Sequence, residues 1–403
     1  MPAMSSSAPY ELAPIAPEAH LVQNYGRLDV RFVRGEGSWL IDEQNRRYLD
    51  CLSGIAVNAL GHAHPRLVAA ICEQAGQLLH TSNLFHIAPQ ERLANLICDN
   101  CFGERVYFCN SGAEANEAAW KLIRLWGNVV HEGRKSRVIA AKGSFHGRTM
   151  AALSMTGNPA YHAGFEPLLP VELIPYGDLA ALEAAMGPDV AGVMLEPIQG
   201  EGGVVVPPSD YFSGVRALCD QHESLLALDE VQVGTGRTGK MYAHQWDGIE
   251  PDCMQLAKGL GGGVPIGALV TTNELGALLK PGTHASTFGG NHLACAAGVA
   301  VMEALLEEDI LANAIARGEQ LQAGLRALFG ERAVAVRGRG LLVGAQLAED
   351  PKPIMAAALR RGLVVGTAGG QVLRFAPPLT ITADEIAHAL SALELALGDL
   401  ARV

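Results

Sequence analysis

The sequence predicts an α/β protein with two domains: a large one built on a mainly parallel central sheet covered by helices, and a smaller α/β one built from both chain ends. Between about residues 106 and 270, short apolar runs such as VYFC, GVMLEPI and LLALDE alternate with helical stretches such as EANEAAWKLIRLW. This alternation is typical of parallel strands joined by covering helices. The final helical stretch follows Thr382, which has capping-box spacing from Glu385.

Each part of the chain has an expected place. Residues 1–20 are expected to be a flexible N-terminal segment. Residues 21–60 are expected to form the N-terminal part of the small domain, where DVRFVRGEGSWLIDEQNRRYLD predicts a hairpin or meander. Such a unit cannot close a core alone, so we expect it to pack on the C-terminal unit. Residues 61–300 form the expected large domain, and residues 301–403 form the C-terminal part of the small one.

Composition excludes several classes of partner. The 30 Lys and Arg residues against 42 Asp and Glu give a formal net charge of -12, and no basic run is long enough to follow a nucleic acid backbone. No stretch approaches the roughly 20 apolar residues of a membrane span. The first residues lack the basic flank and apolar run of a signal peptide. We therefore expect a cytoplasmic protein that binds neither nucleic acid nor membrane.

The eight cysteines are scattered, mostly in apolar surroundings, as expected of reduced thiols in a cytosolic enzyme. Only Cys98 and Cys101 form a CxxC pair, within ERLANLICDNCFGE, which predicts an amphipathic helix that buries one face. A second pair or nearby histidines would be needed for a zinc site. We expect structural packing and no metal.

Three short motifs place polar groups beside turns. A buried apolar run delivers Asp229 to the end of a strand, where its carboxylate needs a cationic partner. Another ends in Lys258 before a glycine-rich turn, and desolvation there lowers the pKa of a lysine towards that of a usable nucleophile. In VYFCNSGAEANEAAW a strand turns through residues 111–113 into a helix whose free amides can bind phosphate. Each motif alone has an ordinary structural interpretation: an ion pair, a surface lysine or a capped helix.

The segment GTGRTGKM, residues 234–241, satisfies GxGxxG and nearly satisfies a phosphate-binding loop. Met241 stands where a magnesium site needs a hydroxyl, and no apolar helix follows. A nucleotide-binding or purely structural protein is thus supported by this segment alone.

Together the motifs resemble the class III, or subgroup II, pyridoxal-phosphate-dependent aminotransferases, from about Val33 to Pro378. The stretches that carry the resemblance, in the family's order, are GIAVNALGHAHP, HTSNLF, NSGAEANEA, SFHGRT, LEPIQGEGG, LDEVQVGTGRTG, AKGLGGGVPIGA and HASTFGGN. The resemblance implies the fold of the fold-type I pyridoxal-phosphate-dependent transferases. It also implies pyridoxal 5'-phosphate as the cofactor.

The resemblance further implies roles at the cofactor ring. Lys258 would bind the cofactor covalently and then, as a free base, move a proton on the substrate carbon. Asp229 would keep the pyridine nitrogen protonated so that the ring can accept electrons. Further cofactor contacts are expected from the residues that stack on the ring, follow Asp229 or reach the phenolic oxygen: Phe145, Glu230, Val231 and Gln232.

The phosphate and substrate ends are implied in the same way. The phosphate would lie on Ser111, Gly112 and Ala113, with Thr287 reaching it from the partner subunit, so a homodimer with shared active sites is expected. The residues implied in substrate binding are Arg148 and Ser286 for the acylated ornithine, Arg374 for the α-carboxylate of glutamate or 2-oxoglutarate, and Glu201, which pairs with Arg374 in the first half-reaction.

The expected activity is reversible transfer of the terminal amino group of N2-acetylornithine to 2-oxoglutarate, giving N-acetylglutamate 5-semialdehyde and glutamate, with ping-pong kinetics, in arginine biosynthesis. Succinylornithine, ornithine, succinyldiaminopimelate and 4-aminobutyrate remain alternative amino donors, because aminotransferases for them share the catalytic residues. A more remote alternative is an aminomutase or decarboxylase on the same fold, since fold does not fix reaction.

Overall fold

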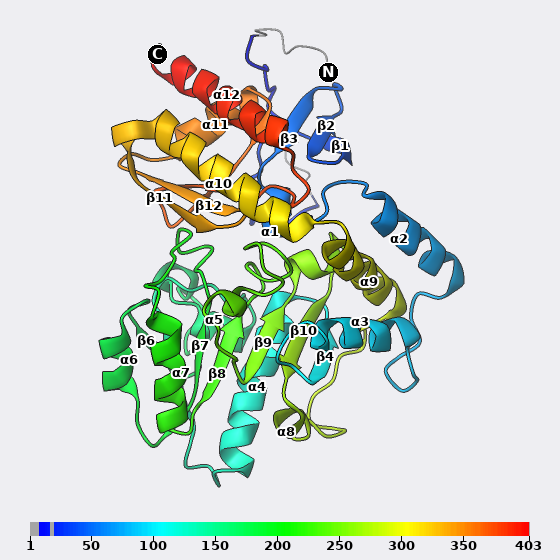
Figure 1. The fold of residues 1–403 in the computed structure, drawn as a ribbon, viewed down its shortest axis with the longest axis vertical. Helices are drawn as coiled ribbons and strands as arrows, with labels where there is room; N and C mark the ends of the chain where they lie inside the picture. Colours follow the sequence, from blue (N-terminus) through cyan, green and yellow to red (C-terminus); the bar gives the residue numbers. More distant parts are fainter. Residues whose placement is uncertain (1–7, 17–19, 403) are drawn as a thin grey trace.

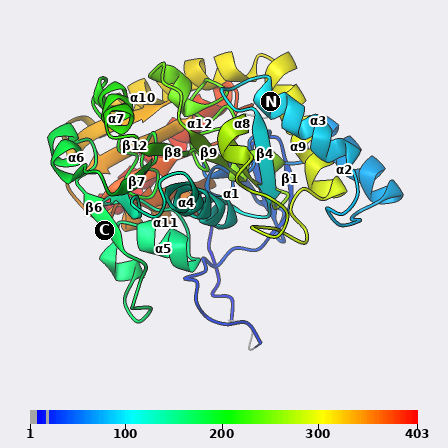
Figure 2. The same cartoon turned by 90° about the horizontal axis from the view of Figure 1, so that it is seen from below.

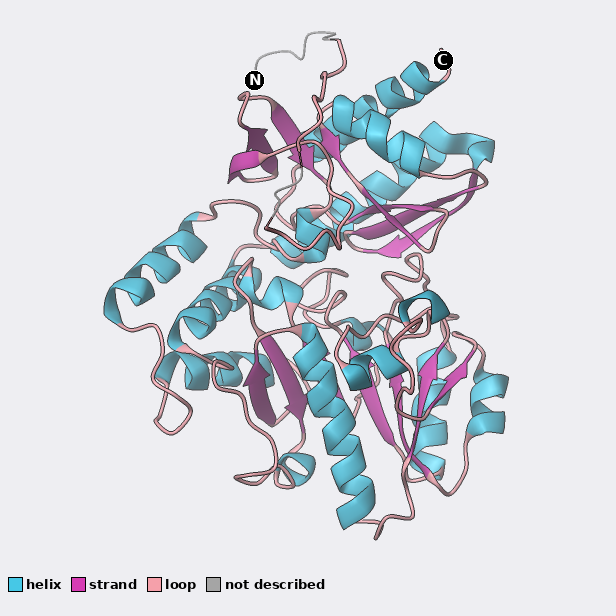
Figure 3. Cartoon of the chain, turned by 180° about the vertical axis from the view of Figure 1, so that it is seen from behind, coloured by secondary structure: helices cyan, strands magenta, loops and turns pink. Residues whose placement is uncertain are grey.

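The structure, a computed structural model, describes residues 8–16 and 20–402. The chain forms two lobes (Figure 1), with the large sheet in one and two smaller sheets in the other. Seen from behind, the strands of the large sheet stand below those of the smaller sheets (Figure 3). No helix among the described residues is long and apolar enough to cross a membrane.

The large sheet has seven strands in the order β4-β10-β9-β8-β7-β5-β6. All neighbours are parallel except β10, which runs antiparallel to both β4 and β9. The expected mainly parallel sheet is confirmed, with one reversed strand. The strand bounds are β4 Arg105–Cys109, β5 Arg137–Ala141, β6 Val171–Ile174, β7 Val190–Leu195, β8 Leu225–Asp229, β9 Cys253–Leu256 and β10 Gly267–Thr271.

Alternate side chains of each inner strand pack on opposite helical layers. In β5, Val138 and Ala140 join the apolar cluster that contains α4, whereas Ile139 and Ala141 join the cluster that contains α7. Figure 2 shows α4 and α5 on one side of the sheet and α6 and α7 on the other. These helices are α4 Gly112–Val129, α5 Met150–Met155, α6 Leu179–Ala185 and α7 Tyr211–Gln221.

The remaining helices of this lobe lie around β4 and β10 or form short turns. α2 and α3 both pack on α9. The bounds are α2 Pro65–Gln77, α3 Ala88–Cys98, α8 Asn273–Gly276 and α9 His292–Glu307, with short 3-10 turns at η1 Pro159–Tyr161, η2 Ala243–Trp246 and η3 Lys258–Gly261. The other lobe holds the short helix α1 Ser53–Ala56 and the 3-10 turn η4 Gly330–Arg332. The predicted helix around the CxxC pair ends at Cys98, so Cys101 lies beyond it.

The second lobe joins the two ends of the chain. The predicted meander is confirmed as β1-β2-β3, and it pairs with the C-terminal unit because β3 lies parallel to β13. A second, antiparallel sheet has the order β11-β12-β15-β14. The bounds are β1 Phe32–Glu36, β2 Trp39–Asp42, β3 Arg47–Asp50, β11 Ala333–Arg339, β12 Leu342–Leu347, β13 Leu363–Val364, β14 Gly366–Ala368, β15 Val372–Phe375, α10 Ile310–Phe329, α11 Lys352–Arg360 and α12 Ala383–Leu400.

Two expected boundaries concern the end of the large domain and the N-terminal segment. Residue 300 lies inside α9, and a boundary within a packed helix is physically implausible, so we propose to place it at the α9–α10 junction. The expected flexible segment, residues 1–20, lies partly outside the described residues. Within its described part, the Tyr10 amide donates to the Arg360 carbonyl over 2.7 Å, and the Tyr10 ring meets that of Tyr48 edge-on.

The predicted capping box at the start of α12 is confirmed, and it also ties the two chain ends together. The Thr382 hydroxyl accepts from the Glu385 amide over 3.2 Å, and Glu385 Oε2 accepts from the Thr382 amide over 2.9 Å. Glu385 also accepts hydrogen bonds from Trp39 Nε1, over 2.8 Å, and from the Ser38 hydroxyl, over 3.2 Å. One carboxylate therefore serves the helix start and the N-terminal meander.

This double role predicts unequal losses of stability. Thr382→Ala should lower the free energy of unfolding by about 1 kcal/mol, as expected for a lost N-cap. Glu385→Ala should lower it by about 2 kcal/mol, because Trp39 also loses its acceptor. Asp384→Ala removes an acid from the same helical turn without these contacts and serves as the control. The measurement is the urea midpoint, and equal losses for the variants at 384 and 385 would contradict the prediction.

Candidate active site

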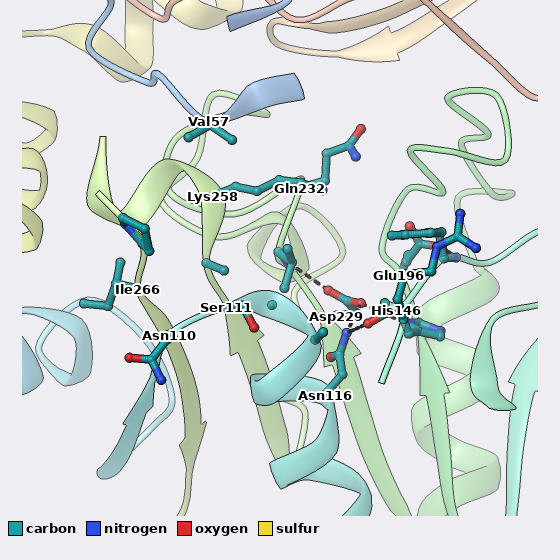
Figure 4. A pocket seen from close by; sticks show the side chains of 18 of the residues that line it. Val57, Asn110, Ser111, Asn116, His146, Glu196, Asp229, Gln232, Lys258 and Ile266 are labelled. Carbon is teal, nitrogen blue, oxygen red and sulfur yellow. Dashed lines mark hydrogen bonds and ion pairs between the residues drawn. The ribbon is translucent and has the colours of Figure 1, made fainter. Parts of the chain in front are cut away.

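A cavity of about 440 Å³ opens at the carboxyl ends of the parallel strands, where ligands of such sheets are expected to bind. Its walls come from the start of α4, the loop after β5, the residue after β7, the residues after β8 and the turn after β9, with Val57 added from the small lobe (Figure 4). Of the residues expected at the site, those that line it are Ser111, Gly112, Ala113, Phe145, Arg148, Asp229, Val231, Gln232 and Lys258.

Asp229 ends β8 and is only 4% exposed. Its Oδ2 accepts hydrogen bonds from His146 Nδ1, over 2.7 Å, and from Asn116 Nδ2, over 2.8 Å. Its Oδ1 accepts from the Val231 amide over 3.0 Å. Burial alone would lower the pKa of His146, but the hydrogen bond to Asp229 and its charge outweigh burial and raise that pKa. His146 is therefore the partner of Asp229 within the chain, and its ring holds a proton more tightly than an exposed histidine does.

Glu196, the residue after β7, is 5% exposed and also lines the cavity. Its Oε2 accepts from the Phe145 amide over 3.2 Å, and its Oε1 accepts from the Gly200 amide over 3.3 Å. Burial raises the pKa of Glu196 to about 8, with the charge on His146 opposing that rise and the charge on Asp229 adding to it. This carboxyl group therefore holds a proton more tightly than an exposed glutamic acid does.

Asn116, His146 and Glu196 were not singled out by the sequence reasoning, although all three lie inside quoted motifs. Two signals were available. Glu196 directly follows the fully buried strand β7, and Asp229 is the last residue of the fully buried strand β8. Because these strands are parallel neighbours, their carboxyl ends lie at the same edge of the sheet. Asn116 is a polar residue on the otherwise apolar buried face of α4, where it needs a partner.

Lys258 begins the turn after β9 and points into the cavity (Figure 4). Its φ of +34° lies in the left-handed region, which costs a residue with a side chain about 1–2 kcal/mol. Burial lowers the pKa of its amine, although the charges of Glu201 and Asp229 act in the opposite direction. A lysine amine with a lowered pKa is more often uncharged and nucleophilic.

The start of α4 leaves two amides available at the cavity. Ser111 caps the helix by accepting from the Glu114 amide over 3.2 Å. A full capping box would also need the Glu114 carboxylate to accept from the Ser111 amide, but this carboxylate binds Asn110 instead. The amides of Gly112 and Ala113 have no intrahelical acceptor and, with the helix dipole, favour an anion.

The other walls carry an aromatic ring and a cation. Arg148 lies over the rings of Tyr161 and Phe145, with its Cζ 3.9 Å and 5.5 Å from their centroids. Among the described residues no carboxylate pairs with Arg148. A Cβ added to Gly112 would come within 2.7 Å of a Val231 methyl group, so the helix start and Val231 approach as closely as glycine permits.

Glu201 and Arg374 form an ion pair beside the cavity, with Arg374 Nη1 donating to Glu201 Oε1. Arg374 comes from β15 in the small lobe, so this pair joins the two lobes. Burial alone would raise the pKa of Glu201, but the charge and hydrogen bond of Arg374 lower it below its ordinary value.

Three expected site residues stand elsewhere. The Glu230 carboxylate does not line the cavity; it accepts from the amides of Ala243 and His244 and binds the His244 ring, and a cofactor contact of Glu230 stays a prediction. Thr287 is exposed and does not line the cavity of its own chain. Ser286 lines a separate cavity of about 350 Å³ and accepts a hydrogen bond from Asn110, which borders the main one.

Glu196 should make stability depend on pH. Between the ordinary carboxyl pKa and about 8, the folded protein keeps a proton that the unfolded chain releases, so the free energy of unfolding falls as pH rises. The slope is at most about 1.4 kcal/mol per pH unit. Glu196→Gln cannot ionise, so its melting temperature relative to the parent should increase from about pH 5 to about pH 8.

Thermal unfolding of the cofactor-free proteins across this range checks the prediction. Glu183→Gln is the matched control, because Glu183 is exposed. A difference between parent and Glu196→Gln that stays constant with pH would contradict it.

Comparisons with known proteins agree with this geometry. Residues 22–397 match the family described as aminotransferase class III. The chain is 46% identical over 385 residues to the acetylornithine aminotransferase of Caldanaerobacter subterraneus, covering 94% of this chain and 98% of that one. It is 48% identical over 387 residues to the enzyme of the same name from Mycolicibacterium smegmatis, covering 95% and 97%.

Solved structures give the same result. The N-acetylornithine aminotransferase of Stenotrophomonas maltophilia superposes with a TM-score of 0.82 at 41% identity, covering 94% of this chain and 98% of that one. The ornithine aminotransferase of Toxoplasma gondii gives a TM-score of 0.91 at 36% identity, covering 95% and 93%. The chain therefore belongs to the class-III aminotransferase family.

Proposed function

We propose that this aminotransferase reversibly transfers the terminal amino group of N2-acetylornithine to 2-oxoglutarate, giving N-acetylglutamate 5-semialdehyde and glutamate in arginine biosynthesis. The observation that carries the proposal is the convergence, in one cavity, of the Lys258 amine, the buried Asp229 carboxylate and the free amides at the start of α4. The choice of amino donor is supported by the similarity to proteins named acetylornithine aminotransferase over nearly their full length.

The residues of the cavity fit pyridoxal 5'-phosphate. The amides of Gly112 and Ala113 suit its phosphate, and the Asp229 carboxylate suits a protonated ring nitrogen. Lys258 points into the cavity and supplies an amine whose pKa is lowered by burial, as suits a nucleophile that binds the cofactor covalently. When bound, the cofactor supplies an aldehyde for the amine and a ring that accepts the electron pair of a broken C–H bond.

The protein's own residues divide the remaining work. Lys258, with its lowered pKa, accepts and returns a proton at the reacting carbon of the substrate. Asp229 holds the positive charge of the ring nitrogen, and His146 with Asn116 keep the Asp229 carboxylate in place. Phe145 and Val231, which both line the cavity, are the proposed ring contacts.

We assign the two carboxylate-binding roles to different arginines. Arg148, which lines the cavity and has no carboxylate partner among the described residues, binds the carboxylate of the acylated ornithine far from the reacting amine. Arg374 binds the α-carboxylate of glutamate or 2-oxoglutarate and pairs with Glu201 when the reacting carbon bears no carboxylate. This alternation lets one site accept both substrates in a ping-pong sequence.

We further propose a cytoplasmic homodimer in which Thr287 and Ser286 act at the active site of the partner subunit. The exposure of Thr287 and its absence from the cavity lining of its own chain support this arrangement. Succinylornithine, ornithine, succinyldiaminopimelate and 4-aminobutyrate stay alternative donors.

The central test combines a variant with a panel of amino donors. Lys258→Ala should lose turnover by at least about a thousandfold, because both the covalent anchor and the proton-moving base are lost. The parent should lose the visible absorption of its bound cofactor fastest with N2-acetylornithine. Lys142→Ala, at an exposed lysine, is the matched control.

Two results would overturn the proposal. A colourless parent after expression with ample vitamin B6, together with normal turnover by Lys258→Ala, would remove the mechanism. If the visible absorption fell fastest with 4-aminobutyrate or succinyldiaminopimelate, the assignment of the amino donor would be wrong, but the mechanism would stand.

The variant Arg148→Gln tests whether Arg148 and Arg374 bind different substrates. The KM for N2-acetylornithine should rise about tenfold or more, as expected for a lost charge-assisted contact, whereas the KM for glutamate should change less because Arg374 binds it. Steady-state kinetics with each substrate measure this, and Arg134→Gln, at an exposed arginine, is the control. Equal changes in both constants would disprove the division of roles.

A further inference from the structure

Gln232 forms hydrogen bonds with both members of the Glu201–Arg374 ion pair. Its Nε2 donates to Glu201 Oε1 over 3.3 Å, and its Oε1 accepts from Arg374 Nη1 over 3.3 Å. Arg374 Nη1 also donates to Glu201 Oε1 directly. The three side chains form a closed triangle, in which one amide gives a donor to the carboxylate and an acceptor to the guanidinium.

Separating this pair is costly because Arg374 is shielded from water and the Glu201 side chain is only 26% exposed. Arg374 is 3% exposed, and its Nε has no hydrogen-bond partner among the described residues. Under the proposed function, Arg374 must release Glu201 when it binds a substrate α-carboxylate, which leaves Glu201 without its cation. Only a side chain that both donates and accepts can keep one hydrogen bond on each partner during this change, and an amide has both.

The position of the Gln232 amide depends on the absence of a side chain at Gly200. A Cβ added at Gly200 would lie 2.2 Å from Gln232 Oε1, 2.4 Å from its Cδ and 2.7 Å from its Nε2. These are the three nearest atoms, so a methyl group there meets the amide first and most severely. Gly200 therefore provides a way to displace the amide without altering Glu201, Arg374 or Gln232 itself.

We propose that Gln232 is a positioning residue for the second substrate: it stabilises Glu201 and Arg374 while their pair is open, and Gly200 provides the space for its amide. This inference rests on the proposed function. It assigns to Gln232 a role in choosing between substrates with and without an α-carboxylate, in addition to the cofactor contact expected at this position.

The test compares the two half-reactions of the holoenzyme in single turnovers, read by the visible absorption of the cofactor. One uses N2-acetylornithine, whose reacting carbon bears no carboxylate, and the other uses glutamate. In Gly200→Ala the glutamate rate constant should fall about tenfold relative to the N2-acetylornithine rate constant, the loss expected for one hydrogen bond to a charged group. Gln232→Leu should show the same imbalance, and adding Gly200→Ala to it should change nothing further.

Gly398→Ala is the matched control, because a Cβ there meets no atom within 4 Å, and its two half-reactions should match the parent. Equal losses in both half-reactions of Gln232→Leu would overturn the inference, as would a Gly200→Ala effect that persists in the Gln232→Leu background. A parent that responds to neither N2-acetylornithine nor glutamate would overturn the proposed function and this inference with it. A parent that responds to both, with variants that show no imbalance, would overturn the inference alone.

Discussion

A carboxylate buried at the end of a strand constrains the whole cavity. Asp229 is 4% exposed, and an ion in such surroundings is tolerated only when it is paired and hydrogen-bonded. Its partners, His146 and Asn116, come from the loop after β5 and from the first turns of α4, whereas Asp229 itself ends β8. Three segments distant in sequence must therefore meet before this charge is stable, and parallel strands with crossover helices bring them to one edge of the sheet.

The positive groups that lack a negative partner in the cavity indicate the charge of its ligands. Asp229 pairs with His146, and Glu201 pairs with Arg374. Arg148 has no carboxylate partner among the described residues, and the amides at the start of α4 add a partial positive charge at another wall. A ligand pair with a phosphate at one end and a substrate carboxylate at the other supplies the missing negative charge at both places.

Sequence patterns predicted the large sheet well because its inner strands are fully buried and read as apolar runs between helices. The reversal of β10 was not predictable, because a buried strand has the same pattern in either direction. Similarly, Glu230 and Glu196 both stand just after a strand, but their positions do not reveal that one carboxylate binds His244 in the core while the other lines the cavity. Those orientations depend on turns whose geometry only the folded chain defines.

The small lobe contributes a strained turn, residues 53–56, directly before Val57 in the cavity wall. Ser53 to Ala56 all have positive φ, between 52° and 68°, a conformation that costs residues other than glycine roughly 1–2 kcal/mol each. Asp50, at the end of β3, binds the amides of Leu52 and Ser53 through Oδ1 and His62 through Oδ2. This left-handed turn leads directly to Val57 in the cavity wall. Since β3 is held by β13, the strain at the N-terminal side of the site is supported by a strand from the other end of the chain.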